Sequence, residues 1–172
     1  MSVAAVVLAA GEASRFGTPK QRLLLPYVLE RLEQSPVDDV VVVAGAHTLE
    51  TPARVVTCAG WKRGPGASLA SGLEELGDEV EAAIVVLADG PDLAPGAVER
   101  VIASWRAEGG TLVAASYGGE RGHPLLVARE AWDTIPDAGL RKLEARLVPC
   151  DDLGDPGDVN TPADLPERLR YP

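Results

Sequence analysis

Short apolar runs rich in β-branched residues constrain the fold of this chain more than any other feature of its sequence. Five of them occur, at residues 3–9, 40–44, 54–57, 82–87 and 111–116. Runs of this length and composition are typical of buried strands. In the segments between them, apolar residues recur at three and four positions, which predicts helices at residues 21–33, 68–76 and 95–108.

The alternation of strand, helix and strand predicts an α/β fold with right-handed crossovers and a mainly parallel sheet covered by helices on both faces. A chain of 172 residues has room for one such core, so we expect a single domain over residues 1–172. Ligands of open α/β sheets bind beyond the carboxyl ends of the strands. Functional residues are therefore to be sought directly after each apolar run.

The C-terminal third is less regular. We expect a strand at residues 124–128, a loop at residues 151–158, and helices from residue 130, around residues 140–147 and from residue 162. Thr161, Pro162 and Asp164 match the preferred N-cap, first and third positions of the last helix. Pro26 interrupts the first helical segment and leaves its bounds open.

The chain carries 16 Lys and Arg residues against 26 Asp and Glu residues, a net charge of −10. This charge repels nucleic acid and anionic membranes, so neither is expected as a partner, and any phosphate site must be built locally. Cys58 and Cys150 lack the spacing of a disulfide framework or a metal site and are interpreted as buried thiols. Without a signal peptide or an apolar run of about 18 residues, the chain is expected in the cytoplasm.

The first apolar run leads into a small-residue loop that carries two cations just before a helix, and its candidate nucleotide-binding residues are Leu8, Ala9, Ala10, Gly11, Arg15 and Lys20. Backbone N–H groups and added cations can cradle a triphosphate. The loop is not a Walker A motif, because five residues separate Gly11 from Gly17, and it lacks the dinucleotide glycine pattern of a hydride-transferring oxidoreductase. A flexible turn with solvated charges is the alternative.

Oxygen-bearing side chains stand at two further positions. Asp89 directly follows the fourth run, where a carboxylate can hold Mg²⁺ that bridges substrate phosphates, although a cap or turn role explains it equally well. Asp158 and Asn160 alternate before the last helix and could approach one cation from the same side, with an Asx-type turn as the competing interpretation. These three residues are the candidate ligands of a magnesium ion.

Two more segments carry candidate binding residues. Ser68 is a further candidate nucleotide-binding residue, because it lies at a loop-to-helix junction with glycines and an upstream basic pair, a pattern that suits an anion. An ordinary loop with glycines at its turns is the alternative. Arg121 and His123 are expected in a tight turn, where they could bind an anionic acceptor, and His123 could act as an acid or base. A histidine in a surface turn is the alternative.

These elements, in this order, resemble the MobA-like nucleotidyltransferase family, and most closely its molybdenum cofactor cytidylyltransferase branch. The matching segments span nearly the whole chain, at residues 8–20, 66–72, 87–91, 121–124, 139–141 and 158–165. The resemblance implies a Rossmann-like three-layer α/β/α sandwich of the nucleotide-diphospho-sugar transferase type. It also implies transfer of NMP from an NTP to a phosphorylated acceptor of the molybdopterin type, with Mg²⁺ and release of pyrophosphate.

The same resemblance assigns roles to individual residues. In the family, the cations that match Arg15 and Lys20 hold the phosphates and the acid that matches Asp89 holds the metal, so catalysis is expected to depend on these three residues. The position of Asn160 can supply a second metal ligand. Attack by the acceptor's phosphate on the α-phosphorus needs two anions held together and a leaving pyrophosphate stabilised, which cations and a metal provide.

The segment Ala9-Ala10-Gly11 matches the cytidylyl branch, whereas the guanylyl branch has Ala-Gly-Gly, so CTP is expected over GTP. The methyl group of Ala10 would narrow the base pocket. The chain departs from the family where Gly90 replaces a glutamine and Asn160 an aspartate. A molybdoenzyme or its chaperone would be the protein partner. Guanylyl transfer, another phosphorylated acceptor, and a non-catalytic nucleotide-binding or cofactor-delivery module are the alternatives.

Overall fold

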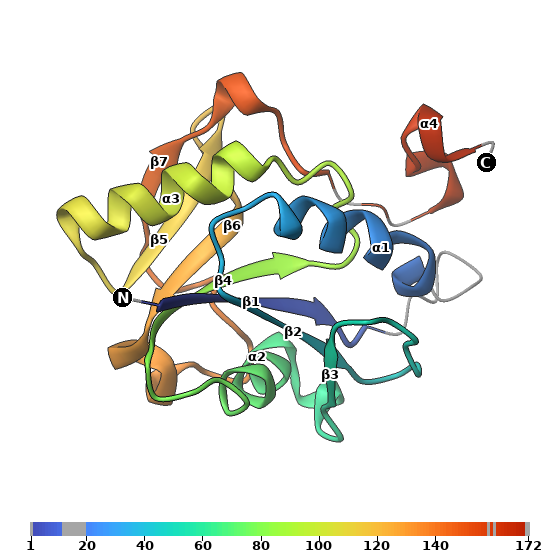
Figure 1. The fold of residues 1–172 in the computed structure, drawn as a ribbon, viewed down its shortest axis with the longest axis horizontal. Coiled ribbons are helices and arrows are strands. Elements are labelled where there is room, and N and C mark those ends of the chain that lie inside the picture. Colours follow the sequence, from blue (N-terminus) through green and yellow to red (C-terminus); the bar gives the residue numbers. More distant parts are fainter. Residues whose placement is uncertain (1, 12–19, 158, 160, 171–172) are drawn as a thin grey trace.

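The computed structural model describes residues 2–11, 20–157, 159 and 161–170. These residues form a seven-stranded sheet with helices on both faces (Figure 1). The strands are β1 (Ser2–Ala9), β2 (Asp39–Ala44), β3 (Arg54–Thr57), β4 (Val80–Leu87), β5 (Leu112–Tyr117), β6 (Glu120–Ala128) and β7 (Arg146–Pro149). The α-helices are α1 (Lys20–Glu33), α2 (Pro65–Leu73), α3 (Pro95–Glu108) and α4 (Glu167–Arg170). Shorter 3₁₀ helices are η1 (Trp61–Arg63), η2 (Arg129–Thr134), η3 (Asp151–Leu153) and η4 (Pro162–Asp164).

The strand order is β3-β2-β1-β4-β6-β5-β7. β1 pairs in parallel with β2 and β4, β2 with β3, and β5 with β7, while β6 runs antiparallel to its neighbours β4 and β5. The predicted mainly parallel sheet is therefore confirmed. The reversed strand follows from the turn at Gly118 and Gly119, both at positive φ, because such a two-residue turn joins antiparallel strands.

The hydrophobic core lies on both faces of the sheet. Helices α1 and α3 cover one face, and α2 with η2 covers the other (Figure 1). Along β1, Val3, Ala5 and Val7 pack on the side of α1 and α3, whereas Ala4 and Val6 pack on the side of α2. Burial on both faces is the reason that this strand reads as an uninterrupted apolar run, and the predicted three-layer α/β/α sandwich is confirmed.

Two of the sequence-based assignments are wrong. Residues 140–147 form no helix, and their last residues belong to β7, which pairs with β5. Leu143 and Leu147 mimic a helical apolar face in sequence, yet they are 39% and 43% exposed. The residues of β3 were expected to be buried, but β3 is an edge strand and most of it is exposed.

Other differences concern the bounds of elements. Pro26 does not end α1, because it is exposed while Leu24, Leu25 and Val28 on the same helix are buried, and this packing holds the helix together. The last predicted helix begins at Pro162 as expected, with the N–H and Oγ1 of Thr161 donating to the Asp164 carboxylate, but it consists of η4 followed by the separate helix α4. No helix in the described ranges is long and apolar enough to span a membrane.

Candidate functional site

The parallel pairing of β1 and β4 brings the two main sequence candidates to one edge of the sheet. Leu8 and Leu87 are register partners, so the chain leaves both strands at the same place. The Nζ atom of Lys20 lies 2.8 Å from Oδ2 of Asp89, although 69 positions separate the two residues. Both side chains are largely buried, at 10% and 17% exposure.

The C-terminal segment completes this cluster. The Lys20 ammonium also donates to the carbonyl oxygen of Val159 at 2.6 Å, and the Val159 N–H donates to the carbonyl oxygen of Asp89 at 3.1 Å. Oxygen atoms from two distant segments thus converge on one positive charge. Carboxylate and carbonyl oxygens are the donors that Mg²⁺ prefers, so Asp89 and Val159 offer atoms of the right kind, but both atoms are hydrogen-bonded here to the Lys20 ammonium.

Three other predicted site residues lie outside the described residues: Arg15, Asp158 and Asn160. Val159, which stands between Asp158 and Asn160, is placed directly against Lys20. In the described part of the chain, no group of three or more His, Cys, Asp and Glu side chains could hold a metal ion. The assignment of the two flanking residues as metal ligands stays a prediction.

The start of the first loop is held by hydrogen bonds that the sequence did not indicate. The side chain of Gln21, at 4% exposure, donates to the carbonyl oxygen of Gly11 at 2.9 Å. The N–H of Ala46, in the segment after β2, donates to the carbonyl oxygen of Ala10 at 3.2 Å. Gln21 directly follows Lys20 in the chain, and this position was the one signal that could have identified it.

Ala10, on which the expected base preference depends, is 8% exposed. Its methyl group packs against Gly45, where a Cβ atom would lie 2.8 Å from the Ala10 Cβ and 2.8 Å from the Trp61 side chain. Ala9 is also buried, and Gly11 is exposed. The preference for CTP over GTP stays a prediction.

A groove of about 810 Å³ opens beside these strand ends, on the face of the sheet covered by α2. Leu8, Leu69, Val85, Leu87 and Leu125 give it an apolar lining. Arg121, His123 and Arg141 add cationic or ionisable side chains at the side of β6. A groove of this size can enclose a nucleotide-sized ligand, and its polar groups can orient an anion. Ser68 is 3% exposed and is not among the residues that line it.

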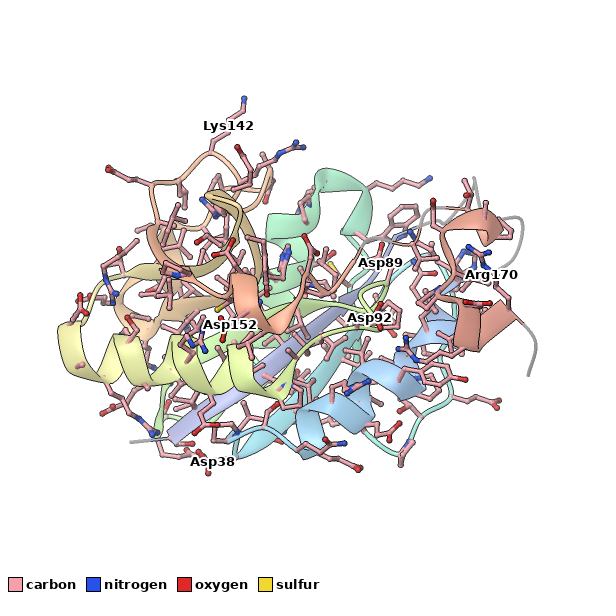
Figure 2. The ribbon with its side chains drawn as sticks, turned by 90° about the horizontal axis from the view of Figure 1, so that it is seen from above. Asp38, Asp89, Asp92, Lys142, Asp152 and Arg170 are labelled. Atoms are coloured by element: carbon pink, nitrogen blue, oxygen red, sulfur yellow. The ribbon has the colours of Figure 1, made fainter. Side chains whose placement is uncertain are left out.

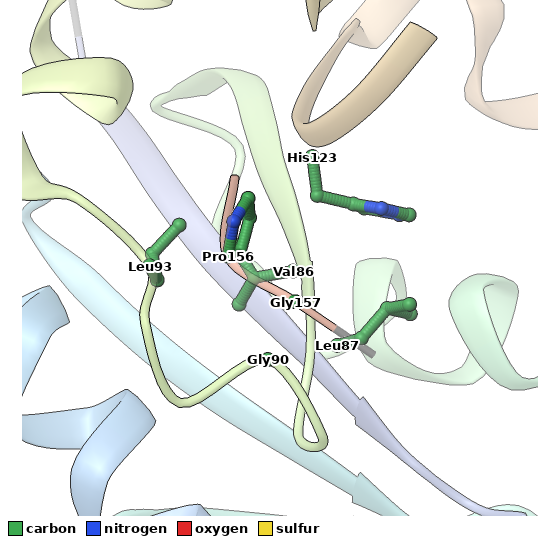
Figure 3. A pocket seen from close by; sticks show the side chains of 7 residues that line it. All are labelled: Val86, Leu87, Gly90, Leu93, His123, Pro156 and Gly157. Atoms are coloured by element: carbon green, nitrogen blue, oxygen red, sulfur yellow. The ribbon is translucent and has the colours of Figure 1, made fainter. Parts of the chain in front are cut away.

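Arg121 and His123 lie within β6 and not in a tight turn as expected, because the turn is formed by Gly118 and Gly119 before them. His123 also lines a small pocket with residues from β4, the turn after it and the C-terminal segment (Figure 3). The guanidinium of Arg121 donates to the carbonyl oxygens of Leu140 and Leu143 at 2.7 and 2.6 Å. Its role as an acceptor-binding residue stays untested.

The turn after Asp89 is tied to the C-terminal segment a second time. The carboxylate of Asp92 forms an ion pair with Arg168 at 2.6 Å. The backbone N–H of Asp92 donates to the carbonyl oxygen of Pro156 at 3.2 Å. Figure 2 labels Asp89 and Asp92 in this turn and Arg170 in α4. Asp92 does not cap α3, whose N-cap residue is Ala94 without a side-chain cap.

Known proteins resemble this chain in sequence and in fold. The model of the MobA-like NTP transferase domain matches residues 5–149. A curated protein of Chloroflexus aggregans, named a probable molybdenum cofactor guanylyltransferase, is 36% identical over 129 residues, which cover 68% of this chain and 60% of that protein.

Solved structures show the same fold. Rv0371c from Mycobacterium tuberculosis H37Rv is 27% identical, with a TM-score of 0.81 and coverage of 100% of this chain and 99% of that chain. Its homolog from Mycobacterium sp. strain JC1 is 28% identical, with a TM-score of 0.80 and coverage of 97% and 94%. The family match extends over most of the chain and includes both Lys20 and Asp89. This chain therefore belongs to the family of MobA-like NTP transferase domains.

Proposed function

We propose that this protein is a Mg²⁺-dependent nucleotidyltransferase that transfers NMP from an NTP to the phosphate of a molybdopterin-type acceptor and releases pyrophosphate. The observation that carries the proposal is the buried contact between Lys20 and Asp89 at the carboxyl ends of β1 and β4, next to the groove. The name of the Chloroflexus relative supports a molybdenum cofactor acceptor.

Each residue of the cluster has a task in this reaction. Lys20 brings a positive charge to the edge of the sheet, where it can donate to the triphosphate together with Arg15 of the first loop. Asp89, with Asp158 and Asn160, would hold a magnesium ion, which would supply further positive charge against the phosphates. The acceptor's own phosphate is the nucleophile, so the protein contributes positioning and charge and needs no nucleophilic side chain.

The identity of the base divides the proposal into two versions. The segment Ala9-Ala10-Gly11 favours CTP, whereas the name of the curated relative favours GTP. The buried position of the Ala10 methyl group, packed against Gly45, weakens the argument that this group narrows the base pocket. Pyrophosphate release measured with CTP and GTP in parallel decides between them.

The test uses the purified protein with Mg²⁺, molybdopterin and each NTP in turn, and follows pyrophosphate. Asp89→Asn should lower the rate by about 100-fold or more, because it removes the carboxylate that would hold the magnesium ion against the reacting phosphates. Asp92→Asn is the matched control in the same turn. Its ion pair with Arg168 is exposed and contributes little, so the rate should stay within about threefold of wild type.

Absence of pyrophosphate with every nucleotide would refute catalysis, whereas equal measurable rates for the wild type and Asp89→Asn would refute the role of Asp89. A non-catalytic nucleotide-binding module is then the second candidate. It is favoured by Gly90, where a Cβ atom would already lie 3.3 Å from the Cβ of Pro156, leaving little room for the family's glutamine. Nucleotide binding that does not change with Mg²⁺ would support this candidate over the enzyme.

A further inference from the structure

One wall of the groove is formed by residues 138–141. They belong to a segment, residues 136–143, that is built directly onto the start of α2. The N–H of Gly66 donates to the carbonyl oxygen of Asp137 at 2.9 Å. A Cβ atom on Gly66 would lie 1.8 Å from the carbonyl oxygen of Pro136, and one on Gly64 would lie 2.2 Å from that of Asp137. The two backbones thus touch without side chains between them, which fixes this end of the segment.

Arg121 fixes the other end. Its guanidinium donates to the carbonyl oxygens of Leu140 and Leu143, the residues on either side of Arg141 and Lys142. Among the described residues, no carboxylate forms an ion pair with Arg121. Burial lowers the pKa of Arg121, yet a guanidinium stays charged at neutral pH. Its donors are therefore engaged by the 136–143 segment.

Arg141 lies between these two fixed ends and lines the groove. It is exposed, and within the part of the chain that the structure describes no hydrogen bond or ion pair engages its side chain. Lys142 is also exposed but does not line the groove, and Figure 2 shows it projecting away from the body of the molecule. Among the described residues that line the groove, Arg121 and Arg141 are cationic and Glu120 alone is acidic, so the charge at this side of the groove favours an anion.

We propose that Arg141 binds a phosphate group of the acceptor and that Arg121 is a positioning residue that holds the 136–143 segment, and with it Arg141, against the groove. This inference rests on the proposed function. The planar guanidinium of Arg141 can donate two parallel hydrogen bonds to a phosphate. The triphosphate is assigned to Lys20 and the first loop, whereas Arg141 lies beside β6, so the two anions would approach from different sides.

The kinetic test measures KM for molybdopterin and for the NTP in Arg141→Ala, Arg141→Lys, Lys142→Ala and Arg121→Ala. Arg141→Ala should raise KM for molybdopterin about tenfold or more and leave KM for the NTP within about twofold, with Arg141→Lys in between. Lys142→Ala removes the same charge from the same segment and should behave as wild type. A rise in KM for the NTP alone would overturn the proposal, because Arg141 would then belong to the nucleotide.

Hydrogen exchange tests the positioning role. The N–H groups of Gly139 and Leu143 are hydrogen-bonded within the segment, so Arg121→Ala should speed their exchange and also raise KM for molybdopterin. Arg141→Ala should leave both exchange rates unchanged. Unchanged exchange in Arg121→Ala would refute the positioning role.

Inorganic phosphate separates a failure of this site from a failure of the proposed function. In the folded wild type, phosphate added at constant ionic strength should shift the backbone NMR signals of residues 138–141, and Arg141→Ala should abolish the shift while Lys142→Ala retains it. If this holds in a protein that releases no pyrophosphate, the anion site stands and the enzyme proposal fails. If phosphate leaves these signals unchanged, or shifts them equally in Arg141→Ala, the anion site is refuted.

Discussion

Replacing Gly66 by alanine is the sharpest test of how the groove wall is attached. The new Cβ would lie 1.8 Å from the Pro136 carbonyl oxygen, 2.8 Å from the Pro136 carbonyl carbon and 2.9 Å from the Gly139 nitrogen. All three are backbone atoms, so no side chain can rotate away. A carbon and an oxygen need about 3.3 Å, and the two backbones must therefore separate by about 1.5 Å.

This separation breaks the 2.9 Å hydrogen bond from the Gly66 N–H to Asp137. Loss of that bond costs about 1–3 kcal/mol, and the strain of overpacking adds about 1–3 kcal/mol. Alanine recovers about 0.5–1 kcal/mol, because it is the better helix former. We expect Gly66→Ala to lower the free energy of unfolding by about 3 kcal/mol.

Gly96→Ala is a closely matched control. Gly96 is also the second residue of its helix and also follows a proline, Pro95. Its Cβ would lie 3.4 Å from the two methyl groups of Leu153, which is an ordinary contact. Gly96→Ala should raise the free energy of unfolding by about 0.4–1 kcal/mol. Urea denaturation followed by circular dichroism measures both variants, and a difference between them below about 1 kcal/mol would refute the close backbone contact.

Three further changes test other parts of the molecule. Pro26→Ala should raise the free energy of unfolding by about 1–3 kcal/mol in urea denaturation, since Pro26 is exposed within α1 and offers no N–H to the preceding turn; a loss of stability would contradict this. Leu24→Ala should lower the free energy of unfolding by about 2–5 kcal/mol, because Leu24 is fully buried against the C-terminal residues. Leu23 is 43% exposed, so the control Leu23→Ala should change the same free energy by less than about 1 kcal/mol. Burial raises the pKa of the Cys150 thiol, so this thiol ionises at a lower pH in the unfolded chain than in the folded protein. The free energy of unfolding should therefore fall as the pH rises above about 8.5, by up to about 1.4 kcal/mol per pH unit. Cys150→Ala should remove this part of the alkaline slope, and equal slopes in the two proteins would contradict the assignment.

The sequence by itself determined the layered α/β plan and the edge of the sheet where the site lies. The strands β1 and β4 could be located because each is buried on both faces and so forms an unbroken apolar run. Helix α3 could be located because its apolar spacing is local. Lys20 and Asp89 then follow from a general rule, since parallel strands deliver the residues after them to one edge.

Only the tertiary structure decided which distant segments meet there. The contact of Val159 with Lys20 spans 139 positions, and the bonds from Arg121 to Leu140 and Leu143 join a strand to an irregular segment. Neither contact leaves a periodic signal in the chain. The same reason explains the error at residues 140–147. Their leucine spacing is helical, but the last two residues pair with β5, and the carbonyl oxygens of Leu140 and Leu143 accept from Arg121. Contacts between segments far apart in sequence are set by packing, which local pattern does not encode.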